Sequence, residues 1–300
     1  MTCEELNRRY GAPGRIAFRE GPSGAPVASL ANQYGSAEIS LYGAQTLSYR
    51  PTGNPPVLFT PSEIAFGPDR QDHGGIPVCW PWFGRCGEKG SYGHGFARRS
   101  VWEVRGSEYS EDITELTLGL KSSPETKALW PYDFDLQLKV SVSMKLNLGL
   151  LTRNVGDRPF RITEGFHPYF LVRDRNLVTV RGLEGCEFCD ARKTDVADAT
   201  WTGDLAFTSS HDHVFTVRKG EFAILDPGLR RAIAIACRGN RKLVVWNPGP
   251  EGVPDRNLGS EDWRRFVCVE PATLFRPDAI EVAPGEKHEL LMAVQSVPEP

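Results

Sequence analysis

The sequence has no excess of basic residues and no long apolar segment. Its 35 Lys and Arg residues against 38 Asp and Glu residues give a net charge of −3, and the pI is about 6.1. Proteins that bind nucleic acid or an anionic membrane surface usually carry a basic excess, so we expect neither partner. No apolar run approaches the length of a membrane span, and the opening residues "MTCEELNRRYG" lack the apolar stretch of a secretory signal. We therefore expect a cytoplasmic protein.

Cysteine is also scarce and unevenly spaced. The odd count of seven fits reduced thiols better than a disulfide framework. Cys186 and Cys189 have C-x-x-C spacing, but the second Cys or His pair that would complete a structural zinc site does not follow at a suitable distance. Most of the other cysteines lie in apolar segments, where cysteine behaves as a small hydrophobic residue. The sequence therefore predicts no bound metal, and no other cofactor is expected.

Helical periodicity is limited to two short segments. One begins after Thr2, which can act as an N-cap with Glu5 in the capping-box position. The other begins after Ser123, has Pro124 at its first helical position, and should end before Pro131. A chain of 300 residues with so little helix must build most of its core from strands.

Period-two alternation of apolar residues dominates the chain. Every second residue from Leu136 to Leu150 is apolar, which indicates one long strand or two consecutive strands with one face on a core. The alternation over residues 113–120 contains one slip, which a β-bulge would explain. There is no internal repeat and no long linker, so we predict a single all-β antiparallel sandwich over residues 1–300. Further strand candidates cover residues 37–43, 231–237, 242–248 and 288–297.

Four stretches carry residues suited to chemistry, and the first is "DHGGIPVCWPWFG", residues 72–84. Pro77 and Pro81 exclude this run from the middle of a regular sheet, so an edge strand packed into the core is the favoured interpretation of the stretch alone. The alternative is one wall of a sugar site, because aromatic faces such as that of Trp82 match the C–H faces of a pyranose ring.

The second stretch is "GHGFARRSVW", residues 93–102. His94 lies between two glycines on a predicted loop, where it can reach a ligand or remain an exposed turn residue. Arg98 offers a fork of donors suited to hydroxyls, a carboxylate or a phosphate, although a surface salt bridge is the favoured role for an isolated arginine. The stretch gains meaning only in combination with others.

The remaining stretches are "EGFHPYF" and "FVCVEPAT". On a strand over residues 164–171, His167 points away from Phe166 and Pro168, and most such histidines are hydrogen-bonded core residues. Glu270 ends an apolar strand before a proline, where a carboxylate must be paired, hydrated or functional. Together the four stretches supply a carboxylate, imidazoles, an arginine and aromatic surface. That set suits reversible proton transfer on a polar cyclic substrate.

The order and spacing of the motifs resemble those of the aldose 1-epimerase, or galactose mutarotase-like, family. The similarity is greatest to its hexose-6-phosphate mutarotase (glucose-6-phosphate 1-epimerase) branch. It extends from about Ala28 to Val297 and implies the large antiparallel β-supersandwich of that family. It also implies an isomerase, expected as a monomer, that interconverts the α and β anomers of a sugar or sugar phosphate without a cofactor. The motifs that carry it are "GGIPVCWPWFG", "HGFAR", "FHPYF", "VVWNPGP" and "FVCVE".

The resemblance also implies roles for individual residues. His167 and Glu270 match the catalytic histidine and glutamate of the family. Arg98 matches a substrate-binding arginine, Asp190 matches an acidic residue that binds sugar hydroxyls, and His94 would line the same pocket.

Two positions depart from the branch. His73 stands where an arginine commonly contributes to substrate binding, and Gly93 stands where a glutamine is common. These departures alter the contacts that would select a phosphorylated sugar, although His73 can still donate a hydrogen bond. Arg70 or Arg85 could supply the missing cation.

Three alternatives remain open. An aldose 1-epimerase acting on unphosphorylated sugars would keep the same acid–base pair with a different pocket edge. A carbohydrate-binding protein without turnover could share the fold, since fold alone does not decide function. A glycoside hydrolase would need two carboxylates across its site, and the sequence offers only Asp190 beside Glu270.

Overall fold

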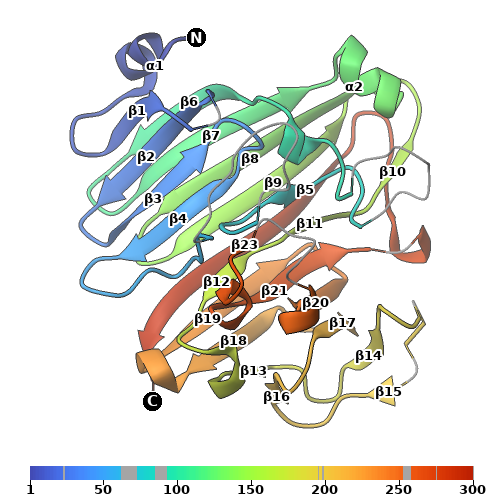
Figure 1. Ribbon diagram of the computed structural model, residues 1–300. Coiled ribbons are helices and arrows are strands. Elements are labelled where there is room, and N and C mark those ends of the chain that lie inside the picture. The colour runs from blue at the N-terminus through green and yellow to red at the C-terminus, as the bar shows by residue number, and fades with distance from the viewer. Residues whose placement is uncertain are drawn as a thin grey trace.

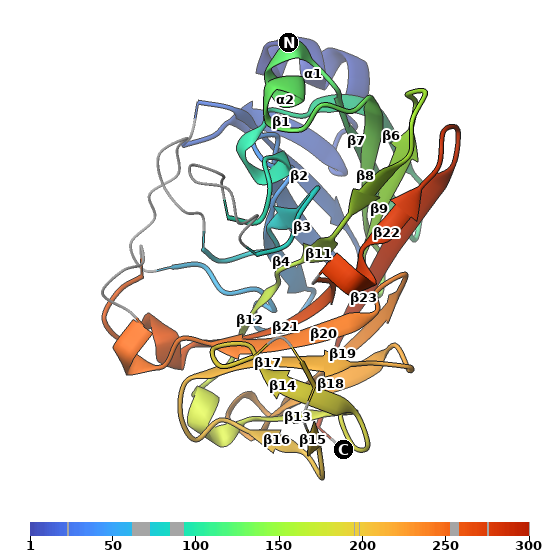
Figure 2. The same cartoon turned by 90° about the vertical axis from the view of Figure 1, so that its right-hand side faces the viewer.

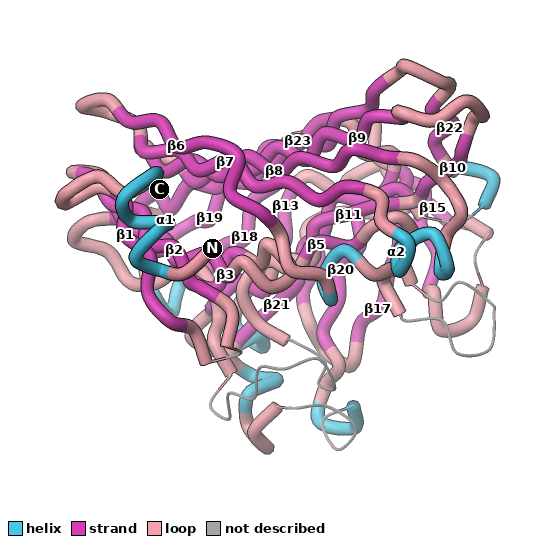
Figure 3. The backbone as a smooth tube through the Cα atoms, turned by 90° about the horizontal axis from the view of Figure 1, so that it is seen from above, coloured by secondary structure: helices cyan, strands magenta, loops and turns pink. Residues whose placement is uncertain are grey.

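Strands dominate the computed structural model (Figure 3), which describes residues 1–22, 24–61, 73–84, 93–194, 196–197, 199–252, 258–274 and 276–299. The sheets pair their neighbouring strands antiparallel, as the alternating sequence predicts. The all-β sandwich is therefore confirmed.

A nine-stranded sheet forms the back layer of the molecule. The alternation between Leu136 and Leu150 is realised as two paired strands, which present their apolar residues to the core. From one edge to the other, the strands are β16 (Leu205–Ala206), β13 (Thr179–Arg181), β18 (Glu221–Asp226), β19 (Arg231–Arg238), β23 (Lys287–Pro298), β9 (Leu146–Asn154), β8 (Phe134–Val142), β7 (Thr114–Lys121) and β6 (Glu103–Tyr109).

The predicted slip over residues 113–120 is not a bulge in that strand. Ile113 lies outside β7 and is about half exposed, while β7 pairs with β8 in an unbroken register. The irregularity lies instead in β6, between Val104 and Gly106. The slip in the alternation therefore marks the start of the strand, at Thr114.

The front layer consists of two larger sheets. A four-stranded sheet packs on the β6–β9 end of the back layer, where β2 and β3 contact β7 and β8 (Figure 1). Its strands are β1 (Ile16–Glu20), β2 (Pro26–Asn32), β3 (Gly35–Ser40) and β4 (Thr46–Pro51). The second, which we call the site sheet, lies beside β18 and β19 (Figure 2). It comprises β15 (Ala199–Thr200), β14 (Glu187–Asp190), β17 (His211–Thr216), β20 (Lys242–Asn247), β21 (Phe266–Thr273), β11 (Glu164–Phe166), β5 (Val78–Cys79) and β12 (Tyr169–Leu171), which pairs with β21.

The smaller elements complete the fold. Strands β10 (Phe160–Ile162) and β22 (Ile280–Val282) pair with each other. Both predicted helices are present, α1 (Cys3–Tyr10) with a Thr2 capping box and α2 (Pro124–Leu129) with a Ser123 cap. Within the described residues, no helix has the length and apolar character needed to cross a membrane. The 3₁₀ turns are η1 (Ala97–Arg99), η2 (Arg175–Leu177), η3 (Pro227–Leu229), η4 (Pro250–Gly252), η5 (Asp262–Arg264) and η6 (Arg276–Asp278).

The two faces of the site sheet have different partners. Because side chains alternate along a strand, odd-numbered residues of β21 face one side and even-numbered residues face the other. The side that carries the odd-numbered residues of β21 packs into the main core between the two layers. The residues of the site sheet on this side are Phe166, Phe170, Phe215, Leu243, Val245, Val267 and Val269. The side that carries the even-numbered residues of β21 is turned away from the back layer. Its residues include Cys189, Val214, Val244, Trp246, Cys268 and Ala272. We call it the outer face.

Candidate active site

His167 lies in a short interruption between β11 and β12. Residues 164–171 therefore do not form the continuous strand that their sequence predicts, since Pro168 cannot donate a ladder hydrogen bond. The register nevertheless continues across the gap. Glu164 pairs with Thr273 and Tyr169 pairs with Cys268, so residue numbers of paired positions sum to 437 on both sides. His167 consequently stands opposite position 270 on the outer face.

Glu270 occupies that opposite position. It does not end its strand, because β21 continues through Pro271 to Thr273. Glu270 Oε1 lies 3.5 Å from His167 Nε2, with the two side chains 1% and 10% exposed. Two titratable groups 103 positions apart in sequence (270 − 167) are thus brought into contact by strand pairing.

Aromatic rings hold the imidazole of His167. The Tyr169 ring stacks on it with centroids 4.8 Å apart and planes inclined by 10°. Phe83 is nearly parallel to it at 6.4 Å, and Trp246 meets it edge-on at 5.7 Å. Gly165 permits this approach, since a Cβ at that position would lie 2.8 Å from the Phe83 ring. The imidazole is therefore presented in a defined orientation on the outer face.

Three cationic or potentially cationic residues surround His167. The ring of His94, which sits in the left-handed region with φ of 62°, meets His167 edge-on with centroids 5.5 Å apart. Its Nδ1 accepts a hydrogen bond from the Gly84 N–H at 3.3 Å. Arg98 and His73 are 9% and 8% exposed. Burial, followed by electrostatic interactions with His94, Arg98 and His73, lowers the pKa of His167 well below its ordinary value.

The carboxyl group of Glu270 has the opposite tendency. Burial raises its pKa well above its ordinary value, and the negative charge of Asp212 adds to this effect. The neutral forms of both residues are thus favoured, with the proton on Glu270. That state contains the same number of protons as a Glu270 carboxylate facing a His167 imidazolium. The pair therefore holds one proton that can occupy either residue.

Each member of the pair also has an unused polar atom. Glu270 Oε2 and His167 Nδ1 are buried and have no hydrogen-bond partner among the described residues. Unsatisfied buried polar atoms are costly, and they are retained mainly where a ligand or a reaction uses them. On these two residues the unpartnered atoms are the ones that do not face each other, so both remain available to a ligand.

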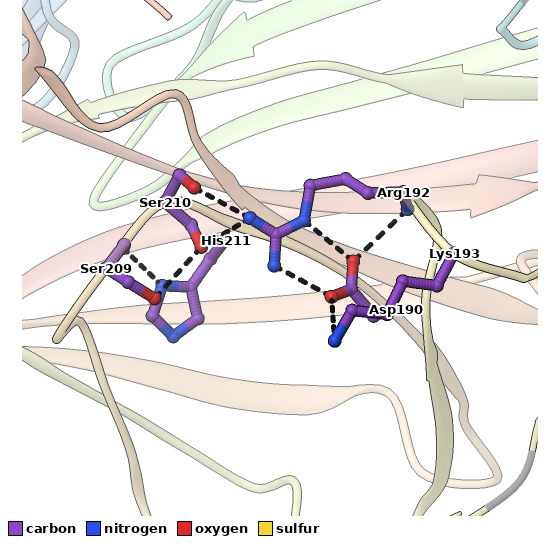
Figure 4. Close-up of polar contacts among 6 residues, drawn as sticks. All are labelled: Asp190, Arg192, Lys193, Ser209, Ser210 and His211. Atoms are coloured by element: carbon purple, nitrogen blue, oxygen red, sulfur yellow. Dashed lines mark hydrogen bonds and ion pairs between the residues drawn. The ribbon is translucent and has the colours of Figure 1, made fainter. Parts of the chain in front are cut away.

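Asp190 does not reach this pair. It is opposite His213, and His213 is opposite Val245, which puts Asp190 on the core side of the sheet, away from Glu270. Its carboxylate receives two hydrogen bonds from the Arg192 guanidinium, at 2.8 and 2.7 Å, and one from the Arg192 backbone N–H at 3.1 Å (Figure 4). The Arg192 guanidinium holds the pKa of Asp190 well below its usual range. Its position does not support the sugar-binding role that the resemblance implies.

Asp212 is the acidic residue that the motifs do not predict. It is opposite Trp246 in the register, and Trp246 is opposite Cys268, so Asp212 lies on the outer face with Glu270. It raises the pKa of Glu270, which places it within electrostatic reach of the pair. The sequence feature that could have identified Asp212 is its alternation with Val214 in "HDHVF". This alternation puts a carboxylate among the apolar side chains of one sheet face.

The aromatic ring that lies at the site is that of Phe83, one residue after the predicted Trp82. Trp82 packs at the margin of the main core and contacts Phe96, with ring centroids 5.8 Å apart. Phe83 is the ring that lies against the histidines, 4.8 Å from His94. The predicted edge position of the stretch is confirmed, because β5 ends the site sheet. Arg70 and Arg85 lie outside the described residues.

Cys268 is a further titratable side chain on this face, next to the pair. It precedes Glu270 by two residues on β21. One potential metal-ligand atom from each of Cys268, Glu270 and His167 lies within 4.8 Å of the other two. The six cysteines of the described residues form no disulfide.

Comparison with known proteins gives a consistent result. The family model of aldose 1-epimerases matches residues 26–295. A protein from Escherichia coli (strain K12), provisionally named glucose-6-phosphate 1-epimerase, is 33% identical over 237 residues, 79% of each chain. A protein from Cenchrus ciliaris with the same provisional name is 30% identical over 272 residues, 87% of this chain and 82% of that one. The crystal structure of a provisionally assigned mutarotase from Salmonella typhimurium superposes with a TM-score of 0.87 at 26% identity, covering 96% of this chain and 95% of that one.

Proposed function

The chain belongs to the aldose 1-epimerase family, and from this premise we propose that it is a hexose-6-phosphate mutarotase that interconverts the α and β anomers of glucose 6-phosphate. The observation that carries the proposal is the 3.5 Å separation of His167 Nε2 and Glu270 Oε1 on the outer face of the site sheet. It is the separation at which one pyranose can contact both groups, with its O1 near one and its ring oxygen near the other.

The proposed reaction moves two protons in opposite directions. Glu270 takes the proton of the O1 hydroxyl while His167 gives a proton to the ring oxygen O5, which breaks the C1–O5 bond and forms the open-chain aldehyde. The C1–C2 bond then rotates. His167 takes the O5 proton back, Glu270 returns a proton to O1, and the ring closes as the other anomer. Two positioned groups can each contribute roughly 10²- to 10⁴-fold.

The single proton of the pair explains why the cycle needs no other acid. Ring opening converts the Glu270 carboxylate and His167 imidazolium into the neutral forms of both, and ring closure reverses this. The pKa directions of the two residues stabilise the neutral form. Sugar hydroxyls bonded to Glu270 Oε2 and His167 Nδ1 would offset that preference when the ring is closed.

The surrounding residues would bind the sugar. We assign His94 and Arg98 to polarising and holding the substrate oxygens, and His73 to one contact at the edge of the site. Asp212 takes the hydroxyl-binding role that the resemblance gives to Asp190, because Asp212 shares the outer face with Glu270. Phe83 supplies the apolar surface for the ring in place of Trp82.

The test is the rate of anomer exchange, measured by polarimetry or exchange NMR. The wild-type protein should accelerate exchange of glucose 6-phosphate more than that of glucose, and His167→Ala should abolish the acceleration without loss of the folded state. Full activity in His167→Ala would end the assignment of the pair. Sugar binding without any acceleration by the wild-type protein would identify a carbohydrate-binding protein instead.

A second candidate is an aldose 1-epimerase of unphosphorylated sugars. The observation in its favour is His73, a residue that is cationic only when protonated, at the position where the branch commonly has an arginine. Equal or greater acceleration of glucose than of glucose 6-phosphate would select this alternative. The chemistry assigned to His167 and Glu270 is the same in both cases.

A further inference from the structure

Cys268 is a titratable residue of the outer face that lies beside the catalytic pair and that the mutarotase reaction does not use. We propose that Cys268, Glu270 and His167 together bind Zn²⁺ and that this binding blocks the catalytic pair; the inhibitory part of the proposal rests on the proposed function. One ligand atom from each of the three lies within 4.8 Å of the other two, and all three residues are buried. It is the only such group among the residues that the structure describes.

The backbone holds these ligands in fixed relative positions. Cys268 and Glu270 are two residues apart on β21, so their side chains leave the same face in parallel. β21 is paired with β20 on one side and with β11 and β12 on the other. His167 stands opposite Glu270 in that register. A site on such a paired strand pays little ordering cost when a metal binds.

The separations suit zinc after a small adjustment. Zinc ligands lie about 2.0–2.3 Å from the metal, so tetrahedral neighbours are about 3.3–3.8 Å apart. His167 Nε2 and Glu270 Oε1 already meet this value at 3.5 Å. The remaining ligand must approach by about 1 Å, which a side-chain rotation provides. Three protein ligands leave the fourth tetrahedral position for water.

The donor set selects a borderline-soft metal. A thiolate, an imidazole and a carboxylate are the ligands that zinc prefers, whereas Mg²⁺ and Ca²⁺ require several oxygen donors. Nearby His94, Arg98 and His73 oppose any cation. The thiolate and carboxylate supply two negative charges, which neutralise Zn²⁺, and Asp212 offsets part of the surrounding positive charge. Mg²⁺ or Ca²⁺ would bind these ligands weakly, and that weak binding would not offset the repulsion by the surrounding positive charge.

Bound zinc would prevent catalysis in a specific way. The metal would occupy the His167 nitrogen and the Glu270 oxygen that must exchange protons with the sugar, and its binding would release two protons, the one that the pair shares and the one on the Cys268 thiol. Sugar and Zn²⁺ should therefore compete. Inhibition should be reversed by a chelator, because no covalent bond is formed.

Cobalt binding tests the site independently of activity. Co²⁺ titrated into the protein should give the absorption of a tetrahedral site with a thiolate-to-metal charge-transfer band. Cys268→Ser should lose that band, and Cys268→Ala should also lose it if serine disturbs the strand. Cys237→Ser is the matched control, since this thiol lies on β19 in the back layer, and it should keep the band.

Inhibition completes the test. Zn²⁺ alone should inhibit anomer exchange by wild-type protein and by Cys237→Ser, and Cys268→Ser should need at least about tenfold more Zn²⁺ for the same effect. Equal inhibition of Cys268→Ser and wild type, or a charge-transfer band that survives in both Cys268 variants, would overturn the proposal. A protein that binds Co²⁺ through Cys268 but never accelerates exchange would disprove the proposed function and leave the metal site standing.

Discussion

Two histidine–glutamate pairs lie at the site sheet, one on each face, and in both the glutamate is buried. Glu164 and His167 are three residues apart in one segment, so they point to opposite sides of the sheet. On the core side, Glu164 Oε1 lies 3.0 Å from His288 Nε2. On the outer side, Glu270 Oε1 lies 3.5 Å from His167 Nε2. Both glutamate side chains are 1% exposed, so the burial of the carboxyl group does not distinguish the pairs.

The neighbours of each pair make the distinction. Glu164 Oε2 accepts a hydrogen bond from the Thr152 hydroxyl, which in turn accepts one from Trp80 Nε1. That chain links the two layers and terminates on an indole that has no further proton to exchange. The outer pair instead borders Arg98, His94 and Asp212, and its spare atoms have no partner in the described chain. A buried acid–base pair thus becomes a candidate for catalysis through the groups around it.

Replacement of the two glutamates gives the largest expected contrast. Glu270→Gln should lower the anomer exchange rate roughly 10²- to 10⁴-fold, because the amide cannot take the O1 proton. Glu164→Gln should retain activity within about threefold, because it lies on the other face of the sheet. Polarimetry on glucose 6-phosphate measures both. Comparable losses in the two variants would mean that the faces are not functionally separate.

The next largest effect is on stability, where replacement of Glu164 should have a larger effect than replacement of Glu270. Glu164→Leu leaves the Thr152 hydroxyl and the His288 imidazole without their carboxylate, which should cost about 3 kcal/mol in the free energy of unfolding. Glu270→Leu removes a carboxyl group that burial already holds in its neutral form, so its cost should be smaller. Urea denaturation at neutral pH measures both values. A more stable Glu164→Leu protein would contradict the structural role of the core pair.

The pH dependence of stability sharpens the comparison further. Burial lowers the pKa of His167, so below the ordinary histidine pKa of about 6.5 the unfolded chain binds more protons at this residue, and its contribution to stability falls as the pH decreases. Burial raises the pKa of Glu270, so above the ordinary glutamate pKa of about 4.3 the folded chain binds more protons there, and that contribution falls as the pH increases. The two contributions offset each other between these values, each at up to about 1.4 kcal/mol per pH unit. His167→Gln should therefore leave the Glu270 contribution alone, so that stability decreases with rising pH across this range. His213→Gln, at a site where burial lowers the histidine pKa to about 4, should act in the same direction without affecting catalysis.

Asp212 and Asp190 should differ in the pH dependence of the rate. Asp212→Asn removes a negative charge that raises the pKa of Glu270, so the alkaline limb of the kcat/KM profile should move to lower pH by up to about one unit. Asp190→Asn should leave that limb in place, because Asp190 is bound to Arg192 on the other face. An identical shift in both variants would show that the effect is not local.

The smallest expected effect concerns the edge of the site. His73→Arg should improve the apparent affinity for glucose 6-phosphate severalfold if this position contacts the phosphate, since arginine is always charged and binds in a fork. Affinity for glucose should not change. KM values for the two sugars give the answer. An unchanged or higher KM for glucose 6-phosphate would show that the phosphate is held elsewhere or is not recognised.

Much of this arrangement can be predicted from the sequence, because it depends on patterns of residues that are close together in the chain. Alternation and punctuation predict the strands, and the caps at Thr2 and Ser123 predict both helices. His167 and Glu270 are prominent because each is a titratable group in an apolar run. Their contact is not predictable from local pattern, since it depends on the pairing of β11 and β12 with β21.

Asp190 and Asp212 show where local reasoning fails. Both are aspartates near the end of a short strand, and motif order directs attention to Asp190. Only the pairing of β14, β17 and β20 reveals that they occupy opposite faces. Trp82 and Phe83 present the same difficulty, because adjacent residues in an irregular edge segment exchange roles with a small change in backbone path.

The constant numbering sum across β11, β12 and β21 limits how this protein can change in length. A single residue gained or lost within 164–171 or 266–273 would turn Glu270 or His167 inward and deliver a valine or phenylalanine outward. Both faces of the sheet would be affected at once. The core would receive a titratable side chain, and the outer face would lose a catalytic residue. Insertions and deletions should therefore accumulate in connecting loops and be excluded from these two segments, which a deletion scan scored for folding and turnover can establish.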